Sequence, residues 1–199
     1  MSANAKTLTS SRRDQIVLAV LDIIGRRGVT ELTTANLAAE VGVTTGALFR
    51  HFPSMESILR GTVEHALARI DATFPDVGLP PVERIVCLAR SRVLLLGENP
   101  GLAWMLRSEQ ALLVLPADCV RELRARARRS RQFLLRALQD AAEQGDIRDD
   151  IDAETLLVPV LGTIHAMIGM PGTRRATATE HILSALVKLL QPIEDRSKP

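Results

Sequence analysis

The sequence is poor in cysteine and in aromatic residues. It has two cysteines, one tryptophan and no tyrosine among its 199 residues. Cys87 and Cys119 are far apart and form no Cys-x-x-Cys pair, so neither a disulfide framework nor a zinc site is predicted. His65, His165 and His181 also lack the i, i+4 partner typical of metal ligands. We therefore expect no metal and a reducing cytoplasm.

Enzyme motifs are also missing. The sequence contains no GxSxG, no HExxH, no P-loop and no GxGxxG after a strand, so we expect neither catalysis nor a cofactor. With 46% hydrophobic and 24% charged residues, the composition is that of a globular protein. A net charge of +2 is too small to identify a nucleic-acid binder, and such a case depends on where the charge lies.

Two segments could be mistaken for membrane or targeting elements. Residues 1–10 lack the apolar stretch of a signal peptide and are predicted to form a short basic arm. Residues 155–173 carry no formal charge over a length that could span a membrane. They include Pro159, His165, glycines and threonines, and a helix buried at a subunit interface is also apolar all round. We therefore predict an interface helix and no membrane partner.

No strand-like alternation occurs, and the predicted fold class is all-α. The first helix is expected over residues 11–27, because apolar residues recur at helical spacing and Gly28 follows them. Thr33 or Thr34 can cap a second helix and Thr44 a third, with Gly42 as the turn between them. A fourth helix is expected from residue 54, and the first unit ends near residue 74.

The proline-rich segment 75–81 predicts a boundary between two domains. Further helices are expected over about 82–96, 100–115, 118–145, 152–170 and 177–190, which makes about nine helices in all. The predicted organisation is an arm (1–10), a helix-turn-helix domain (11–74), a helical C-terminal domain (82–191) and a tail (192–199).

The second and third helices have the chemistry of a DNA-binding helix-turn-helix. Leu48 and Phe52 are expected to pack against the second helix, which leaves the opposite side of the third helix free. That free side carries small, apolar or basic side chains, and no acid occurs between Val41 and Met55. Because phosphates repel acids, this pattern favours DNA binding.

Residues 11–59 closely resemble the N-terminal domain of the TetR family of bacterial transcriptional regulators. The shared elements are Gly28, the threonines that open the second helix, Leu37-Ala38, Gly42-Val43-Thr44, Gly46, Leu48 and the aromatic-x-His-Phe string that ends at Phe52. The resemblance implies a homodimer that places the third helix in the major groove of operator DNA. By the same resemblance, the DNA-contacting residues are Thr33, Thr34, Thr44, Thr45, Gly46, Ala47, Phe49, Arg50 and His51.

Two positions depart from the family pattern. The family usually has tyrosine at Phe49 and lysine at Met55, so one hydroxyl and one ammonium group that meet phosphate are absent. We expect a weaker grip on the DNA backbone, partly restored by Lys6, Arg12 and Arg13.

The resemblance implies that the C-terminal domain binds an effector and forms the dimer. Trp104 and Arg107 are candidate ligand-binding residues, although a tryptophan among leucines is more often a core residue. The last two helices offer candidate interface residues, and two copies would require a pseudo-palindromic operator. These interface residues are Leu157, Leu161, Ile164, Ile168, Ile182, Leu186 and Leu190.

Residues 121–136 form a strongly basic segment, with seven arginines and one glutamate. The plain interpretation is a solvated helix face. The alternatives are a site for an anionic effector, a second nucleic-acid contact and a surface for a partner protein.

The predicted function is a ligand-responsive transcriptional regulator, more specifically a repressor, with an unidentified small-molecule effector. One alternative is a DNA-bound interaction protein such as a nucleoid-associated regulator of cell division, because the segment ENPGLAWMLRSEQALL resembles the nucleoid-occlusion branch of the same family. Another is a helical binding protein or enzyme with a vestigial DNA-binding module.

Overall fold

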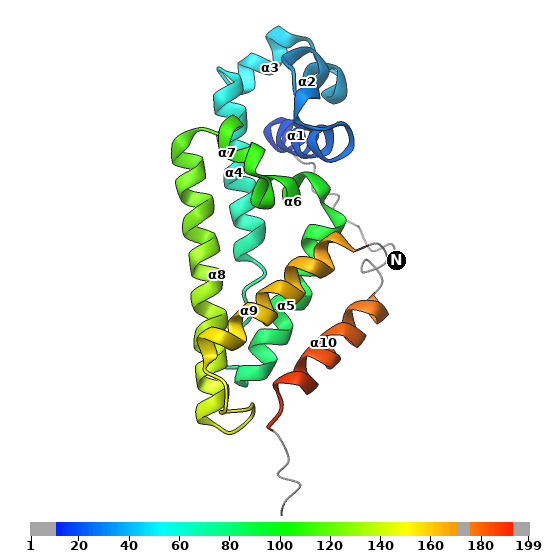
Figure 1. Ribbon diagram of the computed structural model, residues 1–199. Coiled ribbons are helices and arrows are strands. Elements are labelled where there is room, and N and C mark those ends of the chain that lie inside the picture. The colour runs from blue at the N-terminus through cyan, green and yellow to red at the C-terminus, as the bar shows by residue number, and fades with distance from the viewer. Residues whose placement is uncertain (1–10, 171–175, 193–199) are drawn as a thin grey trace, which may run out of the picture. The chain divides into compact units, whose positions relative to one another are not determined.

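The computed structural model describes residues 11–170 and 176–192 of the chain (Figure 1). Within these ranges it contains ten α-helices and one short 3-10 helix, and no strand. The predicted all-α class is therefore confirmed.

The helix-turn-helix forms where the capping residues predict it. Helix α1 (Arg12–Arg27) begins with a capping box between Ser11 and Asp14. Helix α2 (Thr34–Val41) follows η1 (Val29–Glu31), and its N-cap is Thr33, whose hydroxyl accepts a hydrogen bond from the Asn36 amide. Gly42 is left-handed (φ 71°, ψ 39°), as a tight turn requires, and Thr44 caps helix α3 (Thr45–His51).

The later helices follow the predicted order with one division that was not predicted. They are α4 (Met55–Asp71), α5 (Pro81–Glu98), α6 (Pro100–Arg107), α7 (Glu109–Val114), α8 (Ala117–Glu143), α9 (Ala153–Gly169) and α10 (Ala176–Leu190). The single helix expected over 100–115 is two helices, because the Ser108 hydroxyl caps a new helix by accepting from the Gln110 amide. Asp118 does not cap α8 but lies in its first turn and pairs with Arg60.

The chain forms two compact units. The first unit comprises the described residues up to Ala66 together with Pro100–Val120, and the second comprises Leu67–Asn99 and the described residues from Arg121 onward. This division differs from the boundary expected at 75–81, because α6 packs on α1.

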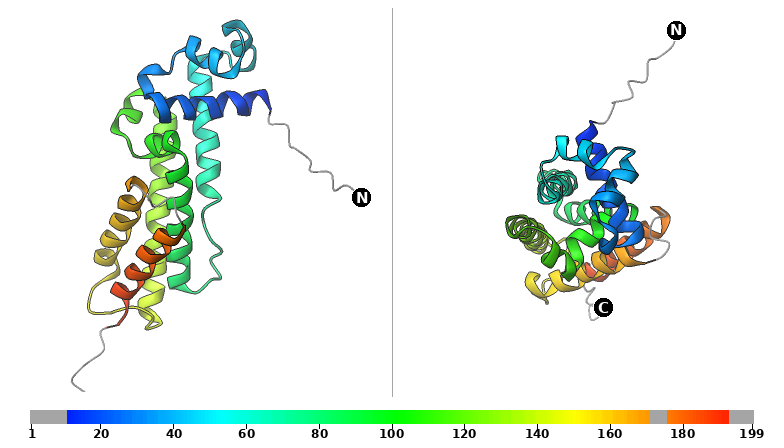
Figure 2. Two further views of the ribbon diagram at one scale, coloured as in Figure 1. Left: turned by 90° about the vertical axis from the view of Figure 1, so that its right-hand side faces the viewer. Right: turned by 90° about the horizontal axis from the view of Figure 1, so that it is seen from above.

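The core of the first unit fixes the positions of α2 and α3. In the side view of Figure 2, α1 is seen lengthwise with α2 and α3 on one side of it. The core of this unit consists of apolar side chains from α1 to α4, namely Ile16, Val17, Ala19, Val20, Ile23, Ile24, Leu37, Leu48, Phe52 and Ile58.

The core of the second unit is formed mainly by α5, α8, α9 and α10. Polar contacts between its helices supplement the apolar packing. Arg84 of α5 donates to Asp140 of α8 at 2.8 Å, with both side chains largely buried. Arg92 of α5 donates to the hydroxyls of Thr73 and Ser130, and burial lowers the pKa of its guanidinium to about 10.

Candidate DNA-binding interface

Helix α3 is held on the first unit by its inner side chains. Leu48 and Phe52 are 0% and 1% exposed, and both pack in the same cluster as Leu37 of α2. A seven-residue helix is not stable alone, so this packing is what keeps α3 folded. The predicted inward face of α3 is confirmed.

The opposite side of α3 faces solvent. Thr45, Gly46, Arg50 and His51 are exposed, and Ala47 and Phe49 are half-buried. A Cβ placed at Gly46 would meet no atom of the protein within 4 Å. No side chain therefore crowds Gly46, so the backbone of α3 can approach a base edge closely.

The basic side chains at the end of α3 have no partner among the residues that the structure describes. In the described ranges, the side chains of Arg50 and His51 make no hydrogen bond or ion pair, although the His51 carbonyl accepts one from Arg13. Arg50 can donate to a guanine edge or a phosphate, and His51 lies beside it.

The threonines that open α2 and α3 act as caps. The Thr33 hydroxyl oxygen accepts from the Asn36 amide at 3.1 Å, and that of Thr44 accepts from the Ala47 amide at 3.2 Å. Each hydroxyl still has its own hydrogen, which can be donated to a phosphate. Thr33 and Thr44 are exposed, whereas Thr34 is half-buried.

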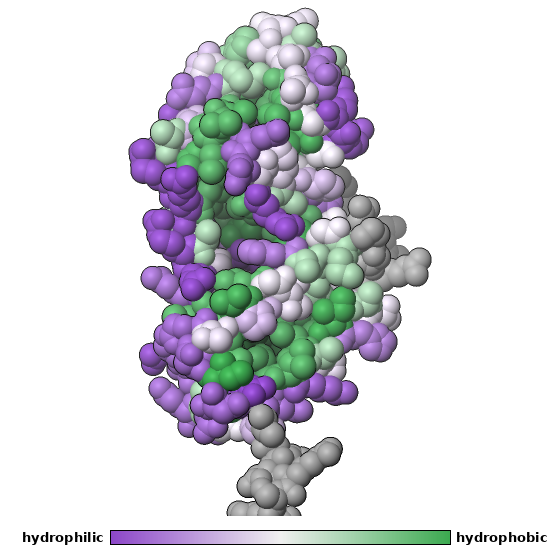
Figure 3. Space-filling model, in the orientation of Figure 1, coloured by the Kyte–Doolittle hydropathy of each residue, from purple (hydrophilic) through white to green (hydrophobic). Residues whose placement is uncertain are grey.

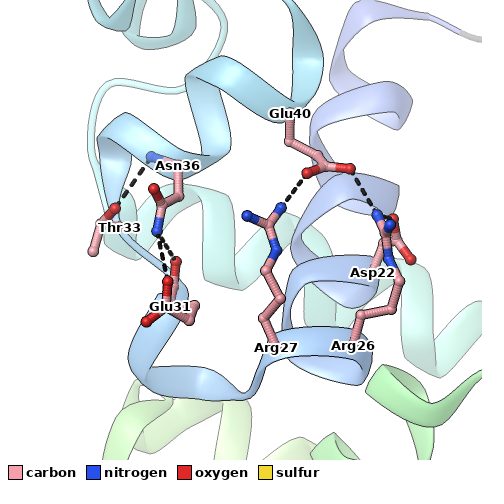
Figure 4. A network of polar contacts seen from close by, with 7 residues as sticks. All are labelled: Asp22, Arg26, Arg27, Glu31, Thr33, Asn36 and Glu40. Atoms are coloured by element: carbon pink, nitrogen blue, oxygen red, sulfur yellow. Dashed lines mark hydrogen bonds and ion pairs between the residues drawn. The ribbon is translucent and has the colours of Figure 1, made fainter.

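A polar network joins the end of α2 to the end of α1, and the start of α2 to η1 (Figure 4). Glu40 of α2 accepts hydrogen bonds from both Arg26 and Arg27 of α1. The Asn36 amide group donates to the backbone carbonyl and the carboxylate of Glu31 in η1. These contacts orient α2 relative to α1, and sequence analysis did not identify them because the partners are separated by loops and turns.

Arg12 and Arg13 have structural partners, which was not predicted. Arg13 donates to the His51 carbonyl at 2.8 Å and lies 4.1 Å from the centre of the Phe52 ring. Arg12 donates to Gln15 at 2.8 Å and to the Val41 carbonyl at 3.5 Å. Both side chains therefore contact the helix-turn-helix backbone, and this is a different role from the phosphate contact expected for them. Lys6 lies outside the described residues.

Met55 begins α4 beside the helix-turn-helix. Its side chain is half-buried and packs against the core of the first unit. An apolar residue fits this position because it covers the core, and a lysine could do so with its aliphatic stem while its ammonium group reaches solvent.

The two candidate ligand residues lie on α6 but in different surroundings. Trp104 is half-buried against the core of the first unit, as expected for a core residue. Arg107 is exposed and has no polar partner in the described ranges. A ligand site at these residues stays a prediction.

The predicted interface residues point inward. Leu157, Ile164, Leu186 and Leu190 are at most 5% exposed, and Leu161, Ile168 and Ile182 pack against the same core of the second unit. Side chains buried within one chain offer little area to a partner chain. After its first turn, which includes the exposed Glu154, α9 has exposed positions without formal charge: Val158, Pro159, Gly162, His165, Ala166 and Gly169. Figure 3 shows apolar and neutral side chains over α9 and α10.

The described residues offer neither a metal site nor a membrane-spanning helix. No group of three or more His, Cys, Asp or Glu side chains there could hold a metal ion. No helix in residues 11–170 or 176–192 is long and apolar enough to cross a membrane.

Comparison with known proteins identifies the family. Residues 16–62 match the sequence model described as bacterial regulatory proteins, tetR family. Nucleoid occlusion factor SlmA of Marinobacter nauticus is 30% identical over 154 residues, which cover 73% of this chain and 73% of that protein. The chain belongs to the TetR family. The SlmA protein of Vibrio cholerae is 28% identical over 84% of this chain and 88% of its own length. The chain spans about half the length of several other SlmA relatives, including that of Aliivibrio fischeri (33% identity).

Solved structures of TetR-like regulators have the same fold. AibR, crystallised with isovaleryl coenzyme A and operator DNA, matches with a TM-score of 0.70 over 90% of this chain and 98% of its own. PfmR of Thermus thermophilus matches with a TM-score of 0.72 over 93% and 98%. The sequence identities are 21% and 23%, so these structures support the fold alone. The chain is thus a TetR-family DNA-binding regulator by fold and family.

Proposed function

We propose that this TetR-family protein is a ligand-responsive repressor that binds a pseudo-palindromic operator as a homodimer. The observation that carries the proposal is the exposed face of α3, where Arg50 and His51 have no partner in the described ranges and no acid lies nearby in sequence. Thr45, Gly46, Ala47 and Arg50 contact bases, and Thr33, Thr34, Thr44, Phe49 and His51 contact the backbone. No catalytic step is part of this function, and the protein acts in the cytoplasm at the nucleoid.

The uncharged exposed face of α9 is the dimer surface in this proposal. Val158 is 63% exposed, and Leu189 of α10 is 71% exposed. Two copies that pair these faces form an isologous contact, in which the same surface of each chain meets its counterpart. The dimer then presents two copies of α3 to half-sites about 34–36 Å apart.

Effector control needs only a small energetic difference between two arrangements of the dimer. A ligand that binds the minor arrangement about 10⁴-fold more tightly than the major one makes the minor arrangement the dominant one. The AibR structure with isovaleryl coenzyme A and operator DNA supports this kind of control in a protein of the same fold.

The SlmA relatives favour a second function, that of a nucleoid-associated regulator of cell division. Two of them, from Vibrio cholerae and Marinobacter nauticus, match across most of the chain and not only in the DNA-binding segment. Mapping of genome-wide binding sites separates the two functions. One or two palindromes at promoters indicate a repressor, whereas many sites spread over the chromosome indicate the nucleoid-associated role. An absence of sites would contradict both.

A further inference from the structure

The structure divides the seven arginines of the basic segment of α8 into two groups. Three pair with acids of the same unit: Arg126 and Arg129 with Asp71, and Arg136 with Asp140. The other four are exposed and make no hydrogen bond or ion pair with any residue in the described ranges. We call these four the arginine stripe: Arg121, Arg124, Arg128 and Arg131.

The stripe runs along one side of α8. Its members are spaced at i, i+3, i+7 and i+10, so they fall within an arc of about 80° and extend over about 15 Å of helix. Hydrophilic side chains gather along α8 in Figure 3. The stripe lies entirely within the second unit, whereas α2 and α3 belong to the first.

Of the six arginines without a partner in the described ranges, four belong to the stripe. Outside the stripe, every arginine of the described ranges except Arg50 and Arg107 donates to an acceptor elsewhere in the chain. Like charges three and four residues apart also destabilise a helix, and the stripe contains three such neighbouring pairs. The stripe therefore costs stability and makes no compensating polar contact with the described part of the chain.

We propose that the arginine stripe is a docking surface for an acidic polypeptide segment of a partner protein. Guanidinium groups bind carboxylates through paired hydrogen bonds, and all four cations of the stripe are arginine. The exposed positions that border it include Ala125 and Ala127, whose small side chains let a partner's backbone approach the helix. A helical partner segment with carboxylates three and four residues apart would match the spacing of the stripe.

Other anionic partners fit the stripe less well. A membrane-bound helix needs bulky, exposed apolar side chains beside its basic residues. The exposed uncharged or acidic positions near the stripe are alanine, glutamate and glutamine, and Leu135 at its end packs against the core. Single-stranded nucleic acid needs aromatic side chains on which bases stack, and the stripe has none.

The test measures binding of a labelled oligoglutamate peptide to the full chain by fluorescence anisotropy at low salt. Arg128→Glu is compared with Arg107→Glu, since both replace an exposed arginine that has no partner in the described ranges. We expect Arg128→Glu to weaken peptide binding about fivefold and Arg124→Glu with Arg128→Glu to weaken it further. Arg107→Glu should have little effect on peptide binding, and operator binding should be unchanged in the two stripe variants.

Three results would overturn the proposal. Equal losses of peptide affinity in Arg107→Glu and Arg128→Glu would show that binding responds to the overall charge of the protein and not to the stripe. Preferential binding of a random duplex that Arg128→Glu abolishes would make the stripe a nucleic-acid contact. Preferential binding of vesicles that contain phosphatidylserine, if Arg128→Glu abolishes it, would make the stripe a lipid contact. Circular dichroism of each variant shows whether it is folded, and operator binding separates these failures from a failure of the proposed repressor function.

Discussion

Gly101 of α6 packs directly on the backbone carbonyl of Leu21 in α1. A Cβ at residue 101 would overlap this carbonyl oxygen, and a Cβ at Gly25 would lie 2.7 Å from the Gly101 amide nitrogen. The two helices thus meet through their backbones within the first unit. This close approach explains why residues 100–120 belong with the DNA-binding helices.

Gly101→Ala should destabilise the first unit. The added methyl group must displace backbone and not a flexible side chain, so we expect a loss of about 1–3 kcal/mol or more in the free energy of unfolding. Urea titration followed by circular dichroism measures it. Gly46→Ala is the control, because its Cβ meets nothing and alanine favours a helix by about 0.5–1 kcal/mol over glycine. Equal stability of the two variants would contradict the close α1–α6 packing.

Arg13→Ala should lower stability without changing the salt dependence of DNA binding. The substitution removes the hydrogen bond to the His51 carbonyl and the contact with the Phe52 ring, which together contribute about 1–2 kcal/mol. Thermal unfolding measures the first effect, and operator titrations at several salt concentrations measure the second. A shallower salt slope with unchanged stability would instead make Arg13 a phosphate contact.

Met55→Lys should tighten binding to all DNA sequences alike. An ammonium group at the start of α4 adds one phosphate contact, which steepens the slope of log K against log salt concentration by about one. The measurement is a pair of titrations, with operator and with random DNA. An unchanged slope would show that residue 55 does not face the DNA backbone.

Val158→Asp should convert the dimer to monomers. The charge would lie in the middle of the uncharged face of α9, where a second copy leaves it without a partner. Analytical ultracentrifugation measures the mass. Leu113→Asp is the matched control, since Leu113 is 87% exposed but lies on α7. A dimer that survives Val158→Asp would require a different interface.

Local sequence signals predicted the helix-turn-helix well. Thr33, Thr44 and Gly42 act through hydrogen bonds or backbone angles within a few residues, so their roles can be inferred from sequence alone. The division at Ser108 was not predicted, because a serine can cap a helix or lie within one, and packing decides between the two.

Contacts between distant segments were beyond sequence analysis. The partners of Arg12 and Arg13 depend on how α1 packs against α2 and α3. The predicted interface residues are apolar positions of α9 and α10, and the structure places them in or against the core of the second unit. In a helix that is apolar on all sides, periodicity does not show which side faces the core.

The most direct test of the account is a footprint of the purified protein on the DNA that flanks its own gene. We predict one protected pseudo-palindrome with half-sites about one helical turn apart. Arg50→Ala should abolish the protection and leave the unfolding transition unchanged, because Arg50 is exposed and has no partner in the described ranges. Protection that persists in Arg50→Ala, or that follows no two-fold symmetry, would contradict recognition of operator DNA by α3.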